Sequence, residues 1–454
     1  MRALTAVDHL FLLLETRKQP MHVAGLCMFE LPPSADDDFV TQLVDQIKIG
    51  KTIPSFPFNQ VLKNVGFWDK DDHFDINHHF RHIALPRAGG DAELMAYISR
   101  EHGRMMDRTK PLWEFHLIEG IAPIQDGAPK RFAIYLKIHH AMVDGIAAMR
   151  LLERSLSTLP DDRFMLPFWS LSTKYRSQID AILPIHKPAW TIIKEQLGTI
   201  KPVAREILRG FKHRHRNNFI STFDAPKSLL NQRISSARSL AMRSFDKTRF
   251  ANVAQKFDIT TNDVILAVCA GALREYLLSQ NALPDKPLIA FVPISLRQDN
   301  SSLGNQLSFL LTNLGTHESS PIARLKTIKN SINDGKKRFS RMTQAQVINY
   351  SALTYGWAGI NLATRAYPAK QAFNLIISNV PGDNTPLYLN GARLTGIFPA
   401  SVLFDGQALN ITLANYQDKL DFGITACIST LPNIDKLPDL IEKHIAEYEN
   451  IAAE

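Results

Sequence analysis

The chain has 454 residues, 45% of them hydrophobic and 21% charged, a balance typical of a globular protein large enough for two hydrophobic cores. Its three cysteines, Cys27, Cys269 and Cys427, are far apart and odd in number. This argues against a disulfide framework or a thiolate metal site and favours a reducing compartment. The net charge of +8 suits nucleic acid, an anionic membrane or an anionic substrate. Because the sequence holds no recognised nucleic-acid-binding motif, we expect no nucleic-acid partner.

The first predicted element is an N-terminal amphipathic helix. The spacing of Val7, Leu10, Phe11 and Leu14 predicts that these side chains face inward. No small-residue cleavage site follows, so a signal peptide is not expected. The longest apolar stretches, such as residues 264–273, are shorter than the ~20 residues of a membrane-spanning helix. We therefore expect a cytoplasmic protein that meets any lipid substrate at a surface.

The most informative segment is His139-His140-Ala141-Met142-Val143-Asp144-Gly145. Residues 131–140 alternate with the period of a strand, which puts His140 on the apolar face that we expect to be buried and turns His139 to the other face. Apolar residues recur at helical spacing after Gly145, so Asp144 is expected near a helix start, where an acidic residue suits the helix dipole. A neutral imidazole can take a proton from an alcohol near physiological pH. His140 is therefore the candidate general base.

Two other interpretations of the histidine pair stay open at this point. The pair can be structural, with one satisfied core histidine beside an exposed one. The interpretation as a metal site has less support, because neighbouring strand residues face opposite sides of the sheet and cannot easily bind the same ion.

A basic, proline-punctuated stretch separates two regions of regular pattern. Between residues 170 and 218 there are ten Lys and Arg against three acidic residues, interleaved with apolar side chains. This pattern is consistent with basic amphipathic helices on acidic headgroups and equally with a solvated linker helix packed on the domains. We assign residues 1–160 to an N-terminal domain, 161–231 to a helical linker and 232–454 to a C-terminal domain.

The C-terminal region alternates strand-like and helix-like segments. Strands are predicted at residues 238–245, 288–294 and 373–380, a strongly apolar helix at 261–278, and an antiparallel strand pair at 408–416 and 419–426. The patterns thus mix helices and strands.

Six segments, in order along nearly the whole chain, resemble the bacterial wax ester synthase/acyl-CoA:diacylglycerol acyltransferase family. The His-His-x-x-x-Asp-Gly signature is shared by the wider superfamily of chloramphenicol acetyltransferase and peptide-synthetase condensation domains, and the other five segments narrow the choice. They are Gln-Pro-Met-His-Val at 19–23, Lys-Pro-Leu-Trp-Glu at 110–114, Thr-Asn-Asp-Val at 261–264, Phe-Val-Pro-Ile-Ser-Leu-Arg at 291–297 and Phe-Asn-Leu-Ile-Ile-Ser-Asn-Val-Pro-Gly at 373–382.

This resemblance implies two chloramphenicol-acetyltransferase-like α/β domains joined by a helical linker, with an active-site tunnel between them. It implies an O-acyltransferase that forms wax esters from long-chain alcohols and triacylglycerols from diacylglycerol. Acyl-CoA is then a substrate, and neither cofactor nor metal is required. The expected location is the cytoplasmic membrane face or a lipid droplet, with an anionic lipid surface as partner. Whether the protein forms a homodimer stays open.

The resemblance also assigns roles around the signature. His140 removes the proton from the acceptor hydroxyl as it attacks the thioester, and His139 supports the loop. Asp144 orients that loop by pairing with an arginine, for which Arg297 is the candidate. Gly145 allows a tight turn or a close approach of the backbone to the ligand, or it is simply the glycine of a strand-to-helix turn. Transfer is expected to be direct, because the chain has no Gly-x-Ser-x-Gly elbow and no recognisable nucleophilic cysteine motif.

Further site candidates each have a structural alternative. Asn262 is either a helix cap or a donor to the oxyanion. The Pro111-Leu112-Trp113 segment shapes the pocket or packs in the core. Ser378 and Asn379 either contact the substrate or simply lie where a strand ends and a turn begins. Gly356 and Trp357 set chain-length preference or pack in the core.

Two alternative functions remain. The protein can be an acyltransferase of the same fold for another hydroxyl or amine acceptor. It can also be a non-catalytic lipid-droplet or acyl-CoA-binding protein. Release of CoA only in the presence of an alcohol would distinguish an acyltransferase from this non-catalytic protein.

Overall fold

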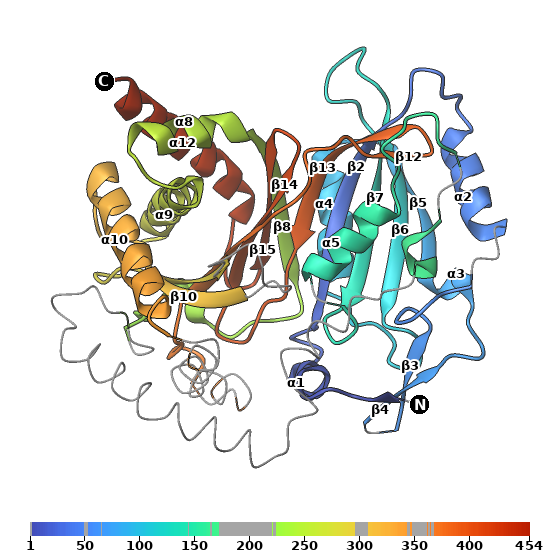
Figure 1. Cartoon of the computed structure of the whole chain (residues 1–454), viewed down its shortest axis with the longest axis horizontal. Coiled ribbons are helices and arrows are strands. Elements are labelled where there is room, and N and C mark those ends of the chain that lie inside the picture. Colours follow the sequence, from blue (N-terminus) through green and yellow to red (C-terminus); the bar gives the residue numbers. More distant parts are fainter. Residues whose placement is uncertain are drawn as a thin grey trace.

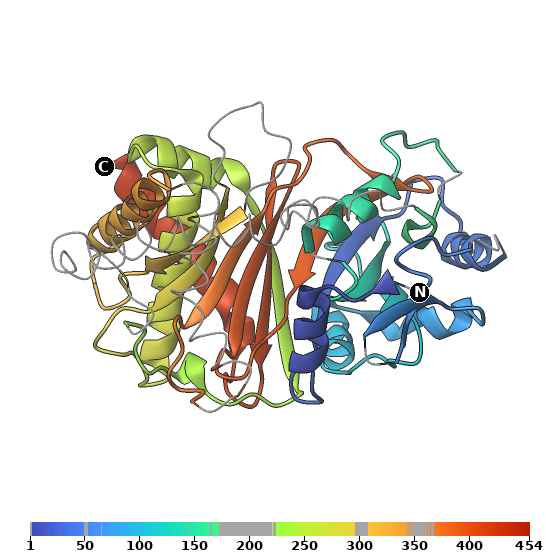
Figure 2. The ribbon, with the colours of Figure 1, turned by 60° about the horizontal axis from the view of Figure 1, so that its bottom comes forward.

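The computed structural model describes residues 2–49, 53–64, 66–143, 145–163, 166–171, 220, 224–295, 307–342, 346, 361, 364 and 367–454. These residues form two α/β halves, each built on a six-stranded sheet, which stand side by side (Figures 1 and 2). The predicted two-part α/β architecture is confirmed.

The N-terminal half is a mixed sheet with helices on both faces. The strand order is β12-β13-β2-β7-β6-β5, with bounds β2 (His22–Glu30), β5 (Phe80–Gly89), β6 (Trp113–Ile121), β7 (Arg131–His139), β12 (Tyr388–Leu389) and β13 (Ala392–Ala400). On one face α4 (Asp91–His102) buries Leu94 and Ile98 against Tyr135. On the other, α5 (Gly145–Arg154) buries Leu151 and Leu152. Both faces of β7 are therefore buried, and the alternation in residues 131–140 does not separate core from solvent.

Smaller elements surround this sheet. They are α1 (Ala6–Leu14), α2 (Phe39–Ile49), α3 (Ile76–His79), the 3-10 turn η1 (Phe168–Ser170), and a three-stranded sheet of β1 (Arg2–Ala3), β4 (Phe67–Lys70) and β3 (Gln60–Lys63). The helix α1 was predicted correctly, but one of its four expected inward side chains, Leu10, is 46% exposed.

The C-terminal half has the strand order β10-β9-β11-β14-β15-β8. Its strands are β8 (Arg238–Asp246), β9 (Ile289–Ser295), β10 (Leu307–Asn313), β11 (Leu375–Val380), β14 (Leu409–Tyr416) and β15 (Lys419–Cys427). Its helical elements are η3 (Leu229–Asn231), α8 (Lys247–Lys256), α9 (Thr261–Ser279), α10 (Pro321–Phe339), η4 (Ile434–Lys436) and α12 (Leu437–Ala453). Every strand and helix predicted in this region is present, including the antiparallel pair of β14 and β15.

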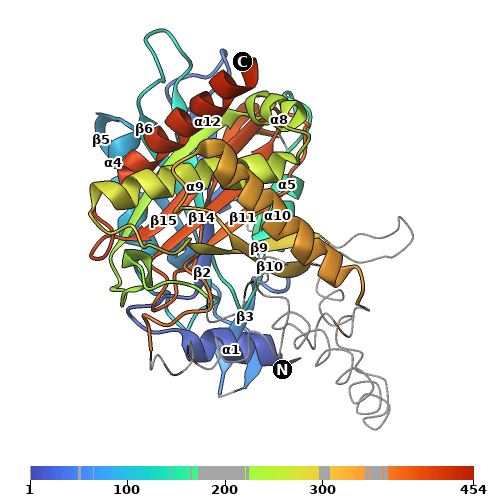
Figure 3. The ribbon, with the colours of Figure 1, turned by 90° about the vertical axis from the view of Figure 1, so that its left-hand side faces the viewer.

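The helix α9 is the centre of this half. Thirteen of its nineteen residues are buried, because α8, α10 and α12 surround it on the side away from the sheet (Figure 3). A helix enclosed on all sides needs no polar face, which explains the continuous apolar run in its sequence.

The division into three consecutive segments needs one correction. Residues 388–400, expected in the C-terminal domain, form β12 and β13 and complete the N-terminal sheet, where β13 pairs with β2. Of the predicted linker, residues 166–171 carry Phe168 and Trp169 into the N-terminal core, and Leu230 packs in the C-terminal core. Residues 172–219 and 221–223 lie outside the described residues.

The two sheets meet where β13 packs on β15. Gly423 of β15 allows this approach, since a Cβ there would lie 1.8 Å from the carbonyl oxygen of Pro399. Next to it, the carboxylate of Asp421 accepts hydrogen bonds from the Ser244 hydroxyl and, at 2.7 Å, from the Ile397 N–H. Asp421 thus bonds strands of both halves at their junction.

The junction should make stability depend on pH. Burial raises the pKa of Asp421 from 3.8 to about 6, although the bonds from Ser244 and Ile397 oppose the rise. Because the folded protein holds this proton more tightly than the unfolded chain, the contribution of Asp421 is largest below pH 4 and is lost as the pH rises to about 6. The loss is on the order of 3 kcal/mol.

We expect Asp421→Asn to cancel this loss, since an amide can accept from Ile397 and donate to Ser244. The difference in Tm between variant and wild type should favour the variant at pH 7.5 and shrink at pH 4.5. A difference that does not change with pH would show that Asp421 is not the titrating group.

Candidate active site

The helix α1 covers the end of β7 that carries the signature. It begins at a capping box in which Thr5 and Asp8 exchange hydrogen bonds. At its end, the amide of Gln19 donates to the Leu14 carbonyl at 2.9 Å, while its oxygen accepts from the Asp405 N–H at 2.7 Å. The helix is therefore fixed to both halves of the molecule.

His140 lies in a turn directly after β7. Its N–H donates to the Met21 carbonyl at 2.9 Å, and the Met142 N–H closes the turn on the His139 carbonyl at 2.9 Å. The imidazole stacks on the ring of Phe11 in α1, with 4.1 Å between centroids and 20° between planes. His140 is half-buried, so its position is fixed while part of the residue stays accessible.

His139 is the fully buried member of the pair. Its Nδ1 accepts the N–H of Ala141 at 3.1 Å, so Nε2 carries the ring proton of the neutral form. That Nε2 lies 3.3 Å from Oε1 of Glu15, the residue that ends α1. The expectation that His140 is the more buried of the two is wrong, because the strand ends at His139 and its face toward α4 is also core.

Glu15 supplies the charge beside this pair. Burial alone would raise its pKa, but the hydrogen bond and charge from His139 and the hydrogen bond from Arg108 outweigh burial and lower it. The Arg108 guanidinium donates to Oε2 of Glu15 at 2.9 Å and to the Leu12 carbonyl at 2.7 Å. Glu15 is thus a buried carboxylate that holds His139 in one orientation.

Two further buried histidines, His22 and His102, lie beside the signature. The His22 ring bonds the His102 carbonyl at 2.7 Å, and the His102 ring bonds the Tyr135 hydroxyl at 2.9 Å and the Ser401 carbonyl at 3.1 Å. Burial lowers the pKa of His102 to about 3 and that of His22 well below its usual value. Both rings therefore stay neutral at physiological pH, and their hydrogen bonds hold the neighbouring segments in place.

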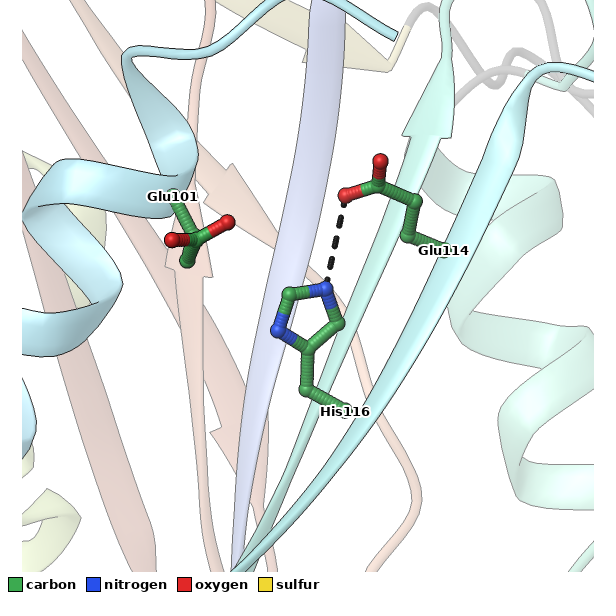
Figure 4. Close-up of side chains that lie close together, drawn as sticks. All are labelled: Glu101, Glu114 and His116. Carbon is green, nitrogen blue, oxygen red and sulfur yellow. Dashed lines mark hydrogen bonds and ion pairs between the residues drawn. The ribbon is translucent and has the colours of Figure 1, made fainter. Parts of the chain in front are cut away.

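Two carboxylates and an imidazole gather deeper in the same layer. Figure 4 shows Glu101 of α4 opposite Glu114 and His116 of β6. One potential metal-ligand atom of each residue lies within 4.8 Å of those of the other two. The buried Lys137 ammonium lies 3.3 Å from Glu114 and donates to the carbonyls of Glu101 and Arg104. The Glu101 carboxylate is paired with the Arg104 guanidinium at 3.4 Å. Since each carboxylate already has a cationic partner, the cluster fits an ion-pair network better than a metal site.

The Pro111-Leu112-Trp113 segment lies against the signature. The Leu112 carbonyl accepts the His139 N–H at 2.9 Å. Trp113 is 1% exposed, donates through Nε1 to the Phe58 carbonyl at 2.9 Å and stacks on Trp169 at 5.3 Å. Trp113 is therefore a core aromatic, and its influence on a pocket acts through Trp169.

Trp169 lines an apolar cavity of about 590 Å³ in the N-terminal half. Other lining residues are Ile47, Phe115, Ile134, Leu152, Leu156 and Phe168. Ile134 lies on β7 six residues before His140, which corresponds to on the order of 20 Å of extended chain. The size and lining are those of a small-molecule site.

The C-terminal candidates are placed as follows. Asn262 is not a cap: Thr260 caps α9, in a capping box with Asp263, and Asn262 is the second residue of the helix. The side-chain oxygen of Asn379 accepts from the amide of Asn415 at 2.6 Å, which ties β11 to β14. Among the described residues, no hydrogen bond links Asn262, Ser378 or Asn379 to either histidine of the signature.

Four candidates, Asp144, Arg297, Gly356 and Trp357, lie outside the described residues. Gly145 is the first residue of α5, as the helix start predicted there requires. The expected pair of Asp144 with Arg297 stays a prediction.

Glu15, Phe11 and Arg108 could not be identified as site residues from the sequence, although Phe11 was expected to face inward. Their signal was weak, because each is separated from the histidine pair by more than twenty residues and none belongs to a motif. The segment 19–23 was noted only as a resemblance, yet it holds α1, His140 and His102 through Gln19, Met21 and His22.

Comparison with known proteins decides the family. Residues 4–265 match the wax ester synthase/diacylglycerol acyltransferase catalytic domain, and residues 303–449 match the WS/DGAT C-terminal domain. The chain belongs to this family. It is 48% identical to the O-acyltransferase WSD of Acinetobacter baylyi, over 100% of this chain and 98% of that protein. It is 38% identical to the probable diacylglycerol O-acyltransferase tgs2 of Mycobacterium tuberculosis, over 97% of each.

Solved structures agree with this family assignment. The wax ester synthase/diacylglycerol acyltransferase from Marinobacter aquaeolei VT8 matches with a TM-score of 0.82 and 40% identity over 100% of both chains. The starter condensation domain of rhizomide synthetase matches with a TM-score of 0.55 and 13% identity, over 100% of this chain and 94% of that one. The second likeness shows the fold alone, which is the condensation-domain type expected for the family.

Proposed function

We propose that this protein is an acyl-CoA-dependent O-acyltransferase that forms wax esters from long-chain alcohols and triacylglycerols from diacylglycerol. The observation that carries the proposal is the geometry of the histidine pair in a chain of this family. His140 is fixed by backbone and stacking contacts yet half-buried, while His139 is locked beneath it by Glu15. A positioned, partly accessible imidazole suits a general base.

The reaction needs no covalent enzyme intermediate. The His140 imidazole takes the proton of the acceptor hydroxyl as its oxygen attacks the thioester carbonyl of acyl-CoA. The tetrahedral intermediate then collapses with cleavage of the C–S bond, and the imidazolium returns the proton to the CoA sulfur. We assign oxyanion stabilisation to Asn262, whose amide is not used as the cap of α9.

The N-terminal cavity offers a place for a long alkyl chain of a substrate. We expect Leu156→Trp to fill part of it, because Leu156 lines the cavity and is partly buried. The ratio of rates with palmitoyl-CoA and octanoyl-CoA should fall about tenfold. The control is Leu159→Trp, at a residue 64% exposed that does not line the cavity. An unchanged ratio in Leu156→Trp would place the chain elsewhere.

We place the enzyme at the cytoplasmic membrane face or on lipid droplets, because long-chain alcohols and diacylglycerol reside in lipid. Among the described residues, no helix combines the length and apolar character needed to cross a bilayer. Contact with a lipid surface is then peripheral. The basic residues between 170 and 218 lie outside the described part of the chain, and their role in this contact stays a prediction.

The test is CoA release, followed with a thiol reagent, from palmitoyl-CoA with hexadecanol, with diolein or without acceptor. The proposal expects release only when an acceptor is present, and the two rates rank the two lipid products. Release that is equally fast without acceptor would indicate a thioesterase. No release with either lipid would favour another acceptor or a non-catalytic acyl-CoA-binding protein.

A further inference from the structure

The outer face of α1 is apolar and exposed. Leu13 is 76% exposed and Leu10 is 46% exposed, three residues apart and therefore neighbours on one side of the helix. The inner side carries Leu14, which is 4% exposed, and Phe11, which is partly buried. The helix thus has two apolar sides, of which the fold buries only one.

Two cations follow this exposed stripe. Arg17 and Lys18 follow α1 after Glu15 and Thr16, and both are exposed. In the part of the chain that the structure describes, neither side chain has a carboxylate partner. Exposed leucines followed closely in the chain by exposed cations are a combination that suits an anionic lipid surface, where apolar groups enter the acyl boundary and cations meet phosphates.

The same helix is rigidly joined to the candidate active site. Phe11 stacks on His140, Glu15 contacts His139 and Arg108 donates to the Leu12 carbonyl. The helix lies at the lower edge of the molecule in Figures 1 and 3, next to β3 and β4. A ligand or surface bound to the outer side of α1 is therefore separated from the signature only by the thickness of this helix.

We propose that the outer face of α1, with Leu10, Leu13, Arg17 and Lys18, docks the protein on an anionic lipid surface. This inference rests on the proposed function, because docking at α1 would place the active site next to the lipid that contains the acceptor. A second copy of the chain is a poorer occupant. A nine-residue helix is about 13 Å long, and its outer stripe is small against the ~800 Å² per partner of a stable interface.

The experiment compares vesicle binding of two double variants with that of the wild-type protein. The test variant is Leu10→Ser with Leu13→Ser. The control is Ile124→Ser with Leu278→Ser, which removes two apolar residues from other surfaces. They are 71% and 49% exposed, close to the 76% and 46% of Leu13 and Leu10. Thermal unfolding confirms that each variant is folded. Vesicles of phosphatidylcholine with phosphatidylglycerol, with and without diolein, are then sedimented.

We expect the partition coefficient of the test variant to fall about tenfold or more, and that of the control to match wild type. CoA release from octanoyl-CoA with a water-soluble alcohol should stay unchanged in both variants, while release with vesicle-borne diolein should fall only in the test variant. Arg17→Glu with Lys18→Glu should weaken binding to the anionic vesicles but not to pure phosphatidylcholine.

Equal vesicle binding by test variant and wild type would overturn the inference. So would a wild-type dimer that the test variant converts to a monomer, because the face would then be a contact between copies. If the wild type releases no CoA with any acceptor but its vesicle binding still depends on Leu10 and Leu13, docking stands and the proposed function fails.

Discussion

Replacing His140 with alanine is expected to lower kcat for wax ester formation about 10³-fold, the usual contribution of a positioned general base. The alanine removes the group that accepts the hydroxyl proton. It leaves the backbone bond to Met21 and the locked His139 in place, because both are made without the His140 side chain. The KM for acyl-CoA should change little, since the imidazole acts in the transition state.

The matched control is His82→Ala on β5. His82 is partly exposed and paired with Glu119 at 2.8 Å, remote in the fold from α1. Steady-state rates of CoA release, with Tm measured for each protein, separate lost chemistry from lost folding. A His140→Ala protein of normal Tm that keeps a third or more of wild-type activity would remove His140 from the role of base.

Gly423→Ala is expected to be strongly destabilising. A Cβ at this position would lie 1.8 Å from the Pro399 carbonyl oxygen, which is backbone and cannot move aside without shifting β13. Overpacking of this kind costs about 1–3 kcal/mol or more. Since β13 joins the two halves, we expect a clear drop in Tm together with loss of activity.

Gly25→Ala is the control for this substitution. Gly25 also lies within a strand, β2, but no atom comes within 4 Å of a Cβ built there. Its Tm should stay equal to wild type or rise slightly, because alanine reduces the entropy of the unfolded chain. Equal Tm values for the two variants would show that the halves do not pack at Gly423 as described.

The elements of the fold could be predicted well from the sequence because their signals are local. The pattern of residues 261–278 required a long helix, and α9 covers Thr261–Ser279. The membership of β13 in the other half could not be predicted in this way. It depends on the pairing of Arg393–Ala400 with a strand more than 350 residues earlier, and no local pattern records such a partner.

In the candidate site, too, the local features could be predicted and the long-range contacts could not. The histidine pair and its strand-to-helix junction could be identified from seven consecutive residues. The relative burial of His139 and His140 could not, because both faces of β7 are covered and the strand stops one residue earlier than the alternation suggests. Glu15 was missed for a related reason: an acidic residue after an N-terminal helix is ordinarily solvated, and only the fold brings it to 3.3 Å from His139.

The most direct test of acyl transfer at His140 follows the acyl group itself. Wild-type protein and His140→Ala are incubated with radiolabelled palmitoyl-CoA and hexadecanol, and the lipid products are separated and counted. Direct transfer predicts one hexadecyl palmitate per CoA released by wild type, with no label left on the protein. Almost no hexadecyl palmitate is expected from the variant. Label bound covalently to the protein, or equal ester from both proteins, would contradict direct transfer at His140.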